Sequence, residues 1–282
     1  MFRFVNNVKT VVLLGAIMGL ALCIGQFWGT NGLIIGFLFG GAMNLIAYFF
    51  SDKIALASMR AQEVTEAEAP ELVGMVRELA MGASLPMPRV YVCPEQAPNA
   101  FATGRDPSHA AVAVTEGLLR AMNPRQIRAV LAHEIAHVRH RDILISSVAA
   151  TIAGAVTMVA RLAWFIPLGG DDDEGGNPLA GLFMLILAPL AAILIQAAIS
   201  RSREYNADSY GGELCGDPRD LASALDRLHT YNEKVPLHAS PSHANMFIVQ
   251  PLIPGGMVGL FSSHPPPERR IARLMEQAAG RS

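Results

Sequence analysis

Four apolar stretches constrain the fold of this 282-residue chain more than any other feature. Each is about as long as the roughly 20 apolar residues that cross the ~30 Å hydrocarbon core of a bilayer. Together they comprise 84 residues and carry one charge, Arg161. They are residues 11–28, 32–50, 143–168 and 179–199. The other 198 residues carry 45 charges, which is normal for a soluble domain. The sequence therefore predicts a soluble domain joined to four transmembrane helices, and it excludes disordered and disulfide-rich secreted proteins.

The positions of the basic residues predict how these helices are oriented. Of the 22 Lys and Arg residues, 21 lie in the N-terminal ten residues and in residues 51–142 and 201–282. Because Lys and Arg accumulate in cytoplasmic loops, both termini and both soluble segments are expected in the cytoplasm. Arg161 is the exception, and we expect its side chain either to extend to the opposite membrane surface or to line a cavity between helices.

The apolar stretches divide the chain into four segments. We expect two transmembrane hairpins, at residues 8–50 and 143–200, and two cytoplasmic parts, at residues 51–142 and 201–282. The first hairpin is closed by the link 29–31. Since both cytoplasmic parts leave the membrane on the same side, they are expected to build one domain. The net charge of −2 gives no reason to expect nucleic acid as a partner, and nothing in the sequence predicts a nucleotide.

Local patterns predict two helices in the first cytoplasmic part. A capping-box pattern at residues 65–68 predicts the start of an amphipathic helix that ends near Gly82. Asn123 and Pro124 form a helix start signal, and this second helix is expected to end near Arg141.

Short runs of β-branched and small residues predict a small sheet beside these helices. Strands are expected at residues 89–94 and 110–115, whereas residues 99–104 are expected to form either a third strand or a loop. The fold class is therefore α+β, mainly helical, with a small sheet.

The second predicted helix contains the sequence HEIAH at residues 133–137. Residues four apart share one face of a helix, so the imidazoles of His133 and His137 can bind one metal ion with Glu134 beside it. Zn²⁺ suits this set, because it binds neutral imidazoles and a carboxylate can take a proton from the water that it activates. The motif predicts a zincin-like metalloprotease with one Zn²⁺ per chain. The alternative is a coincidental histidine pair on a helix face.

A catalytic zinc site usually has three protein ligands. His140 shares the face of the two histidines, but it lies about 10 Å from His133 along an unbroken helix axis. The longer HExxHxxGxxH pattern is also absent. His140 is therefore expected on the surface, as are four further histidines, His109, His229, His238 and His243.

Glu204 is the better candidate for the third ligand. Glu204 and Asp208 are four residues apart on a predicted helix, so both side chains can face the site. Asp208 can then hold a ligating imidazole by its far nitrogen. The alternative is a solvated carboxylate pair beside Arg201 and Arg203.

Four motifs in this order resemble the HtpX family of bacterial membrane zinc proteases, which are relatives of the prenyl-protein CaaX proteases. They are PNAFATG, HEIAH, SRSREYNAD and SHPPPERRI. The resemblance implies a multi-pass protein of the bacterial cytoplasmic membrane with its active site in the cytoplasm. It also implies endoproteolysis of misfolded or damaged membrane proteins under stress.

The resemblance further implies that His133, His137 and Glu204 bind zinc, that Glu134 is catalytic, and that Asp208 supports a ligand. The tetrahedral intermediate of peptide hydrolysis needs one more hydrogen-bond donor, for which His264 is the first candidate and Tyr205 the second. Two alternatives to a quality-control protease are a CaaX-type processing protease and a non-catalytic membrane scaffold or chaperone.

A substrate peptide must lie extended past the metal, and it can do so by adding a strand to a sheet edge. The small residues of the segment Asn99-Ala100-Phe101-Ala102 suit such an edge, and the resemblance implies that this segment lines the cleft. The alternative is a structural turn capped by Asn99. If the segment is the substrate edge, proline at Ala100 and proline at Ala102 are expected to differ in their effects, one blocking substrate and the other disturbing the sheet.

Overall fold

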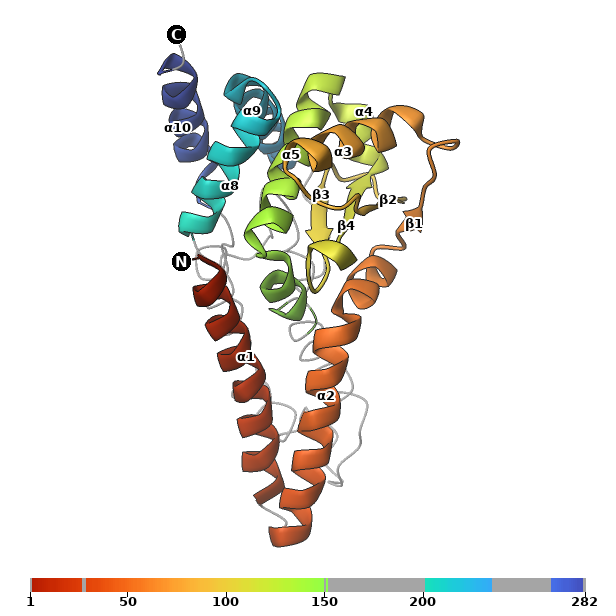
Figure 1. Ribbon diagram of the computed structural model, residues 1–282, viewed down its shortest axis with the longest axis vertical. Helices are drawn as coiled ribbons and strands as arrows, with labels where there is room; N and C mark the ends of the chain where they lie inside the picture. Colours follow the sequence, from red (N-terminus) through yellow and green to blue (C-terminus); the bar gives the residue numbers. More distant parts are fainter. Residues whose placement is uncertain (1, 27–28, 150, 152–200, 235–264, 281–282) are drawn as a thin grey trace, which may run out of the picture.

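The computed structural model describes residues 2–26, 29–149, 151, 201–234 and 265–280 (Figure 1). Helices α1 (Phe2–Gly25) and α2 (Gly29–Ser58) form a long hairpin that projects from the rest of the molecule. The expected link 29–31 is instead the first turn of α2. Gly29, the first residue of α2, has a φ of 67°, which suits a residue without a Cβ.

The two hairpin helices make backbone contact along a row of glycines, at Gly32, Gly36 and Gly40 of α2. A Cβ at Gly36 would lie 2.5 Å from the carbonyl oxygen of Ala21 in α1. Large apolar side chains on the other faces of α2, such as Ile35, are exposed. Within the described part of the chain, α2 is the one helix that is long and apolar enough to cross a membrane, and α1 contains a shorter apolar stretch.

The second predicted hairpin lies almost entirely outside the described residues. Its first seven residues, 143–149, are helical. Apart from residue 151, the remainder of the stretches 143–168 and 179–199, with Arg161, lies outside the described part.

The sheet has four strands in the order β1-β2-β4-β3, listed from one edge to the other. Strand β2 pairs parallel with β4, while β1 and β3 pair antiparallel with their neighbours. Their bounds are Gln62–Glu63 for β1, Arg89–Cys93 for β2, Ala100–Thr103 for β3 and Ala111–Thr115 for β4. The expected strands are confirmed, and the segment 99–104 contains a strand at the sheet edge.

Helix α3 (Pro70–Gly82) ends where the sequence predicts but begins later. The expected capping box closes a separate turn, in which the backbone N–H and the hydroxyl of Thr65 both donate to Glu68 at 2.8 Å. The helix starts at Pro70, because proline has no N–H to satisfy and is suited to the first helical position.

Helix α5 (Pro124–His140) lies at the centre of the part that surrounds the sheet (Figure 1). Its start carries a complete capping box between Asn123 and Gln126. It ends at His140, and the next residue, Arg141, adopts a left-handed φ of 60°. The core joins α3, the sheet, α5 and α9 (Pro218–Lys234) through buried side chains that include Leu79, Val112 and Leu225. The short elements α4 (Glu116–Ala121) and η2 (Pro107–His109) adjoin β4.

Two further helices complete the domain around α5. Helix α8 (Arg201–Leu214) packs along α5, and α10 (Pro267–Ala279) packs against α9 and α8. The described residues after position 200, although distant in sequence, therefore fold onto the helix that carries HEIAH.

Candidate metal centre

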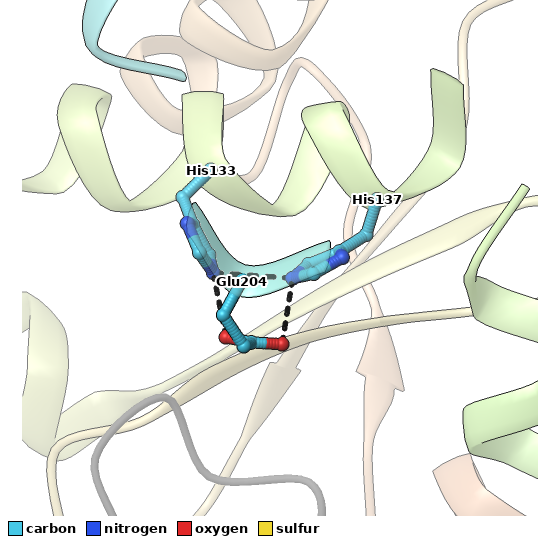
Figure 2. Close-up of side chains that lie close together, drawn as sticks. All are labelled: His133, His137 and Glu204. Carbon is cyan, nitrogen blue, oxygen red and sulfur yellow. Dashed lines mark hydrogen bonds and ion pairs between the residues drawn. The ribbon is translucent and has the colours of Figure 1, made fainter. Parts of the chain in front are cut away.

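Three side chains from two helices converge on one point (Figure 2). The Nε2 atoms of His133 and His137, one turn apart on α5, are 3.1 Å from each other. Glu204 of α8 presents its carboxylate to both, with Oε2 at 3.8 Å from Nε2 of His133 and Oε1 at 3.7 Å from Nε2 of His137. One ligand atom from each residue therefore lies within 4.8 Å of the others. This confirms the predicted juxtaposition of Glu204 with the two histidines.

A glycine permits α8 to approach α5 at this point. A Cβ at Gly211 would lie 2.9 Å from both the Cα and the backbone nitrogen of His133. Real Cβ atoms do not approach backbone this closely, so any larger residue would have to separate the helices. Sequence reasoning did not identify Gly211, because a glycine inside a helix signals only weak helix propensity.

His140 lies at the end of α5, away from the convergence point. Its ring packs edge-on against Tyr210 at 5.7 Å between ring centres. Two of the other histidines pair on the surface, His109 with Asp106 and His229 with Glu268. His238 and His243 lie outside the described residues.

The far nitrogen of His133 is supported by a buried ion pair. Its Nδ1 lies 3.0 Å from Oδ1 of Asp208. Arg270 of α10 donates to the same carboxylate twice, from Nε at 2.8 Å and from a terminal nitrogen at 2.7 Å. Asp208 therefore lies where the sequence predicts. Arg270 is a residue that sequence reasoning missed, and its only signal was its place in the SHPPPERRI motif.

The far nitrogen of His137 also contacts a carboxylate, which the sequence analysis did not identify. Its Nδ1 lies 3.2 Å from Oδ2 of Asp142, the second residue after α5. Asp142 in turn lies 3.9 Å from the guanidinium of Arg203, and both side chains are buried. Arg203 is therefore buried. The alternative to the metal site, a solvated carboxylate pair beside Arg201 and Arg203, had assumed that it was exposed.

Glu134 is buried next to the two histidines. Its Oε2 accepts a hydrogen bond of 2.8 Å from the backbone N–H of Ala102 in β3. Burial raises the pKa of Glu134 to about 7, and the nearby carboxylate of Glu204 acts in the same direction. A carboxyl group with a pKa near neutrality is suited to accept and return a proton.

The two imidazoles differ in their proton affinity. Burial lowers the pKa of His133 to about 4, so this ring is neutral at pH 7. Burial also disfavours the charged form of His137, but the hydrogen bond to Asp142 and the charges of Glu204, Asp142 and Glu134 outweigh it and raise the pKa to about 9. Three carboxylates thus favour a positive charge at His137.

This donor set fits a zinc ion. Two nitrogens bound tetrahedrally at 2.0–2.1 Å from zinc lie about 3.3 Å apart, close to the 3.1 Å between the two Nε2 atoms. Both histidines hold a carboxylate at the other ring nitrogen, which is the usual support of metal-binding imidazoles. The surplus of carboxylates around the imidazoles favours a bound cation.

The predicted substrate segment forms the edge strand β3, beside Glu134. The carbonyl of Asn99 accepts from Thr115 of β4, so the backbone of every second residue from Asn99 faces the sheet. Ala100 and Ala102 therefore both direct their backbone groups outward. We expected proline at one of these positions to block substrate and proline at the other to disturb the sheet. This prediction is wrong, because the backbone N–H groups of residues two apart in a strand point to the same side.

Asn99, Ala100 and Phe101 are buried, and Ala102 is half-buried. Asn99 is anchored by backbone contacts with Thr115. Phe101 packs in an apolar cluster with Leu56 and Tyr91. Of the two candidate oxyanion donors, His264 lies outside the described residues. The ring of Tyr205 packs under the guanidinium of Arg273, at 3.9 Å from the ring centre.

A helix that supplies two histidines and a buried glutamate, completed by a glutamate from a second helix, defines the class of HExxH metalloproteases. Comparison with known proteins agrees. The model of peptidase family M48 matches residues 66–278. Protease HtpX homologs of Burkholderia ambifaria and Burkholderia multivorans are each 53% identical to this chain over 279 residues, covering 97% of both sequences.

The chain therefore belongs to peptidase family M48, and it is a metalloprotease that is similar to the HtpX homologs. Its fold is also similar to the crystal structure of S. mikatae Ste24p, with a TM-score of 0.53 at 22% identity. That alignment covers 97% of this chain and 66% of the Ste24p chain.

Proposed function

We propose that this chain is a zinc-dependent endopeptidase of the bacterial cytoplasmic membrane, which hydrolyses peptide bonds of misfolded or damaged membrane proteins. The observation that carries the proposal is the convergence of His133, His137 and Glu204 beside the buried Glu134. The 53% identity to protease HtpX homologs supports the same activity. The apolar, outward-facing side chains of α2 support a membrane location.

In this mechanism the residues of the protein bind the metal ion and transfer a proton. Bound zinc supplies Lewis-acid chemistry that activates a water and polarises the scissile carbonyl. Glu134, whose pKa burial raises to about 7, accepts the proton of the attacking water and passes it to the leaving amine. His133, His137 and Glu204 would hold the ion, and Asp208 and Asp142 lie where they would orient the two imidazole rings.

An extended substrate is proposed to pair with the outer edge of β3. The outward N–H of Ala100 and the outward carbonyls of Ala100 and Ala102 are proposed to pair with one added strand, since the N–H of Ala102 already donates to Glu134. Since Glu134 accepts from the N–H of Ala102, a peptide on this edge would pass next to the catalytic carboxylate. Asn99 and Phe101 anchor the strand that carries this edge.

The Glu204→Ala variant is expected to lose zinc as well as activity, because it removes one of three ligands. Elemental analysis of the purified protein should show zinc well below one equivalent per chain. The matched control is Glu213→Ala, which removes an exposed carboxylate from the same helix. Full zinc occupancy in Glu204→Ala would place the third ligand elsewhere.

Reconstitution tests the proposed activity directly. The full chain is purified in detergent with a chelator, and zinc is added back while self-cleavage and casein cleavage are followed. Cleavage that depends on zinc supports the proposal. A protein that binds zinc and unfolded casein without cutting it would be a scaffold or chaperone. Cleavage of a prenylated peptide but not of casein would indicate a CaaX-type processing protease.

The proposed topology places the protease domain and both termini in the cytoplasm and residues 169–178 outside. A cysteine at Asp172, which lies outside the described residues, is expected to react with an impermeant thiol reagent applied to intact cells. A cysteine at the exposed Glu95 is expected to react only after lysis. The parent chain, with its three native cysteines, measures the background. The reverse labelling pattern would overturn the topology.

A further inference from the structure

Asp142, whose carboxylate contacts Nδ1 of His137, lies where the chain leaves α5. Asp142 is the second residue after α5, and its own N–H donates to the carbonyl of His137 at 3.0 Å. Arg141, with its φ of 60°, turns the chain so that this bond can form. The side chain of Asp142 can then reach Nδ1 of the same histidine, at 3.2 Å. Residue 142 is thus held to His137 at both its backbone and its side chain.

The same residue starts the next helical segment. The carbonyl of Asp142 accepts from the backbone N–H and the hydroxyl of Ser146, each at 3.3 Å. Asp142 therefore joins the metal-binding end of α5 to residues 143–149, which lead towards residues 152–200.

Arg203, the residue that pairs with Asp142, follows residues 152–200 in the sequence. Arg203 is the third residue of α8, directly before Glu204, and its guanidinium lies 3.9 Å from Oδ1 of Asp142. The side chains of Asp142 and Arg203 are only 4% and 8% exposed. At this distance the terminal nitrogen of Arg203 makes no hydrogen bond to Asp142, so the contact is one of opposite charges. Because both side chains are buried, water screens this attraction only weakly, and it favours one arrangement of the two chain segments.

We propose that Asp142 and Arg203 are positioning residues that hold His137 in its metal-binding orientation, so that the metal site depends on how the chain enters and leaves residues 152–200. Asp142 fixes the ring of His137, and Arg203 fixes Asp142. This inference rests on the proposed zinc function, since it assigns the two residues to the affinity of that site. Neither residue touches substrate.

The test measures the zinc dissociation constant by competition with a fluorescent zinc chelator, on the full chain in detergent. Asp142→Ala and Arg203→Met are expected to weaken zinc binding by about 10- to 100-fold, the usual cost of removing such support. Asp142→Asn keeps the shape and serves if Asp142→Ala does not fold. Arg203→Lys is expected to recover most of the affinity. Arg201→Met, at an exposed position on the same helix, is the matched control.

The double variant separates positioning from a merely structural role. If Arg203 acts through Asp142, Asp142→Ala with Arg203→Met binds zinc about as weakly as Asp142→Ala alone. Folded variants whose zinc dissociation constants stay within twofold of the parent, with only a lower thermal midpoint, would overturn the proposal. If the parent chain itself binds no zinc, the proposed function fails rather than this inference.

Discussion

The Glu134→Gln variant is expected to lose proteolysis by about 10²- to 10⁴-fold while it retains both its fold and its zinc. Glutamine has nearly the same shape, and its amide oxygen can still accept from the N–H of Ala102. It cannot accept the proton of the attacking water, and general-base catalysis contributes a factor of this size. The three predicted ligands, His133, His137 and Glu204, are untouched.

Three measurements on the same preparation test this result: casein cleavage, zinc content by elemental analysis, and the thermal midpoint. The control is Glu78→Gln, which neutralises an exposed glutamate that pairs with Arg128 on the surface. Cleavage by Glu134→Gln at a rate near that of the parent would refute the assigned mechanism. Loss of zinc together with activity would instead show that Glu134 holds the site together.

The second large effect is expected from Gly211→Ala, which adds one methyl group between α5 and α8. This methyl would lie 2.9 Å from backbone atoms of His133, which cannot move aside as a side chain could. The helices must therefore separate, and Glu204 moves away from the two histidines. Overpacking of this kind costs about 1–3 kcal/mol in the free energy of unfolding. Zinc affinity is expected to fall by at least about tenfold, because a shift of α8 displaces a ligand.

Gly74→Ala is the matched control for this substitution. Gly74 lies in α3, and a Cβ there would meet nothing within 4 Å. Alanine is better than glycine in a helix by about 1 kcal/mol, so this variant should be as stable as the parent or more so. Chelator competition and urea unfolding measure both variants. Equal zinc affinity in Gly211→Ala and the parent would mean that the contact between α5 and α8 does not set the ligand geometry.

The sequence predicted most of the catalytic centre because its signals are local. Positions 133 and 137 share a helix face wherever that helix lies in the fold, and Glu204 and Asp208 follow the same spacing. The start of α5 was also predictable, since Asn123 and Pro124 act within one turn of the chain. The start of α3 was misplaced, because Pro70 competes with the capping pattern before it.

The remaining residues of the site could not be predicted from spacing. Arg270 reaches Asp208 across 62 positions of the chain, and Arg203 reaches Asp142 from the far side of residues 152–200. Both arginines occur among other charged residues and resemble ordinary surface cations in the sequence. Their burial beside carboxylates results from the packing of α8 and α10, which no local pattern encodes.

The sequence by itself predicted the class of chemistry and the placement of His133 and His137 on one helix face beside Glu134, because the spacing of side chains on a helix depends on backbone geometry alone. For Glu204 spacing left an alternative open, and the family resemblance implied its role as the third ligand. Tertiary structure decided what holds those groups in place. The contact at Gly211 sets how closely α8 approaches α5, and the packing of α8 and α10 brings a buried arginine beside each of the two carboxylates that contact the imidazoles. The same packing places the edge of β3 next to Glu134. These features depend on distances between elements far apart in the chain, and such distances exist only once the apolar core has brought those elements together.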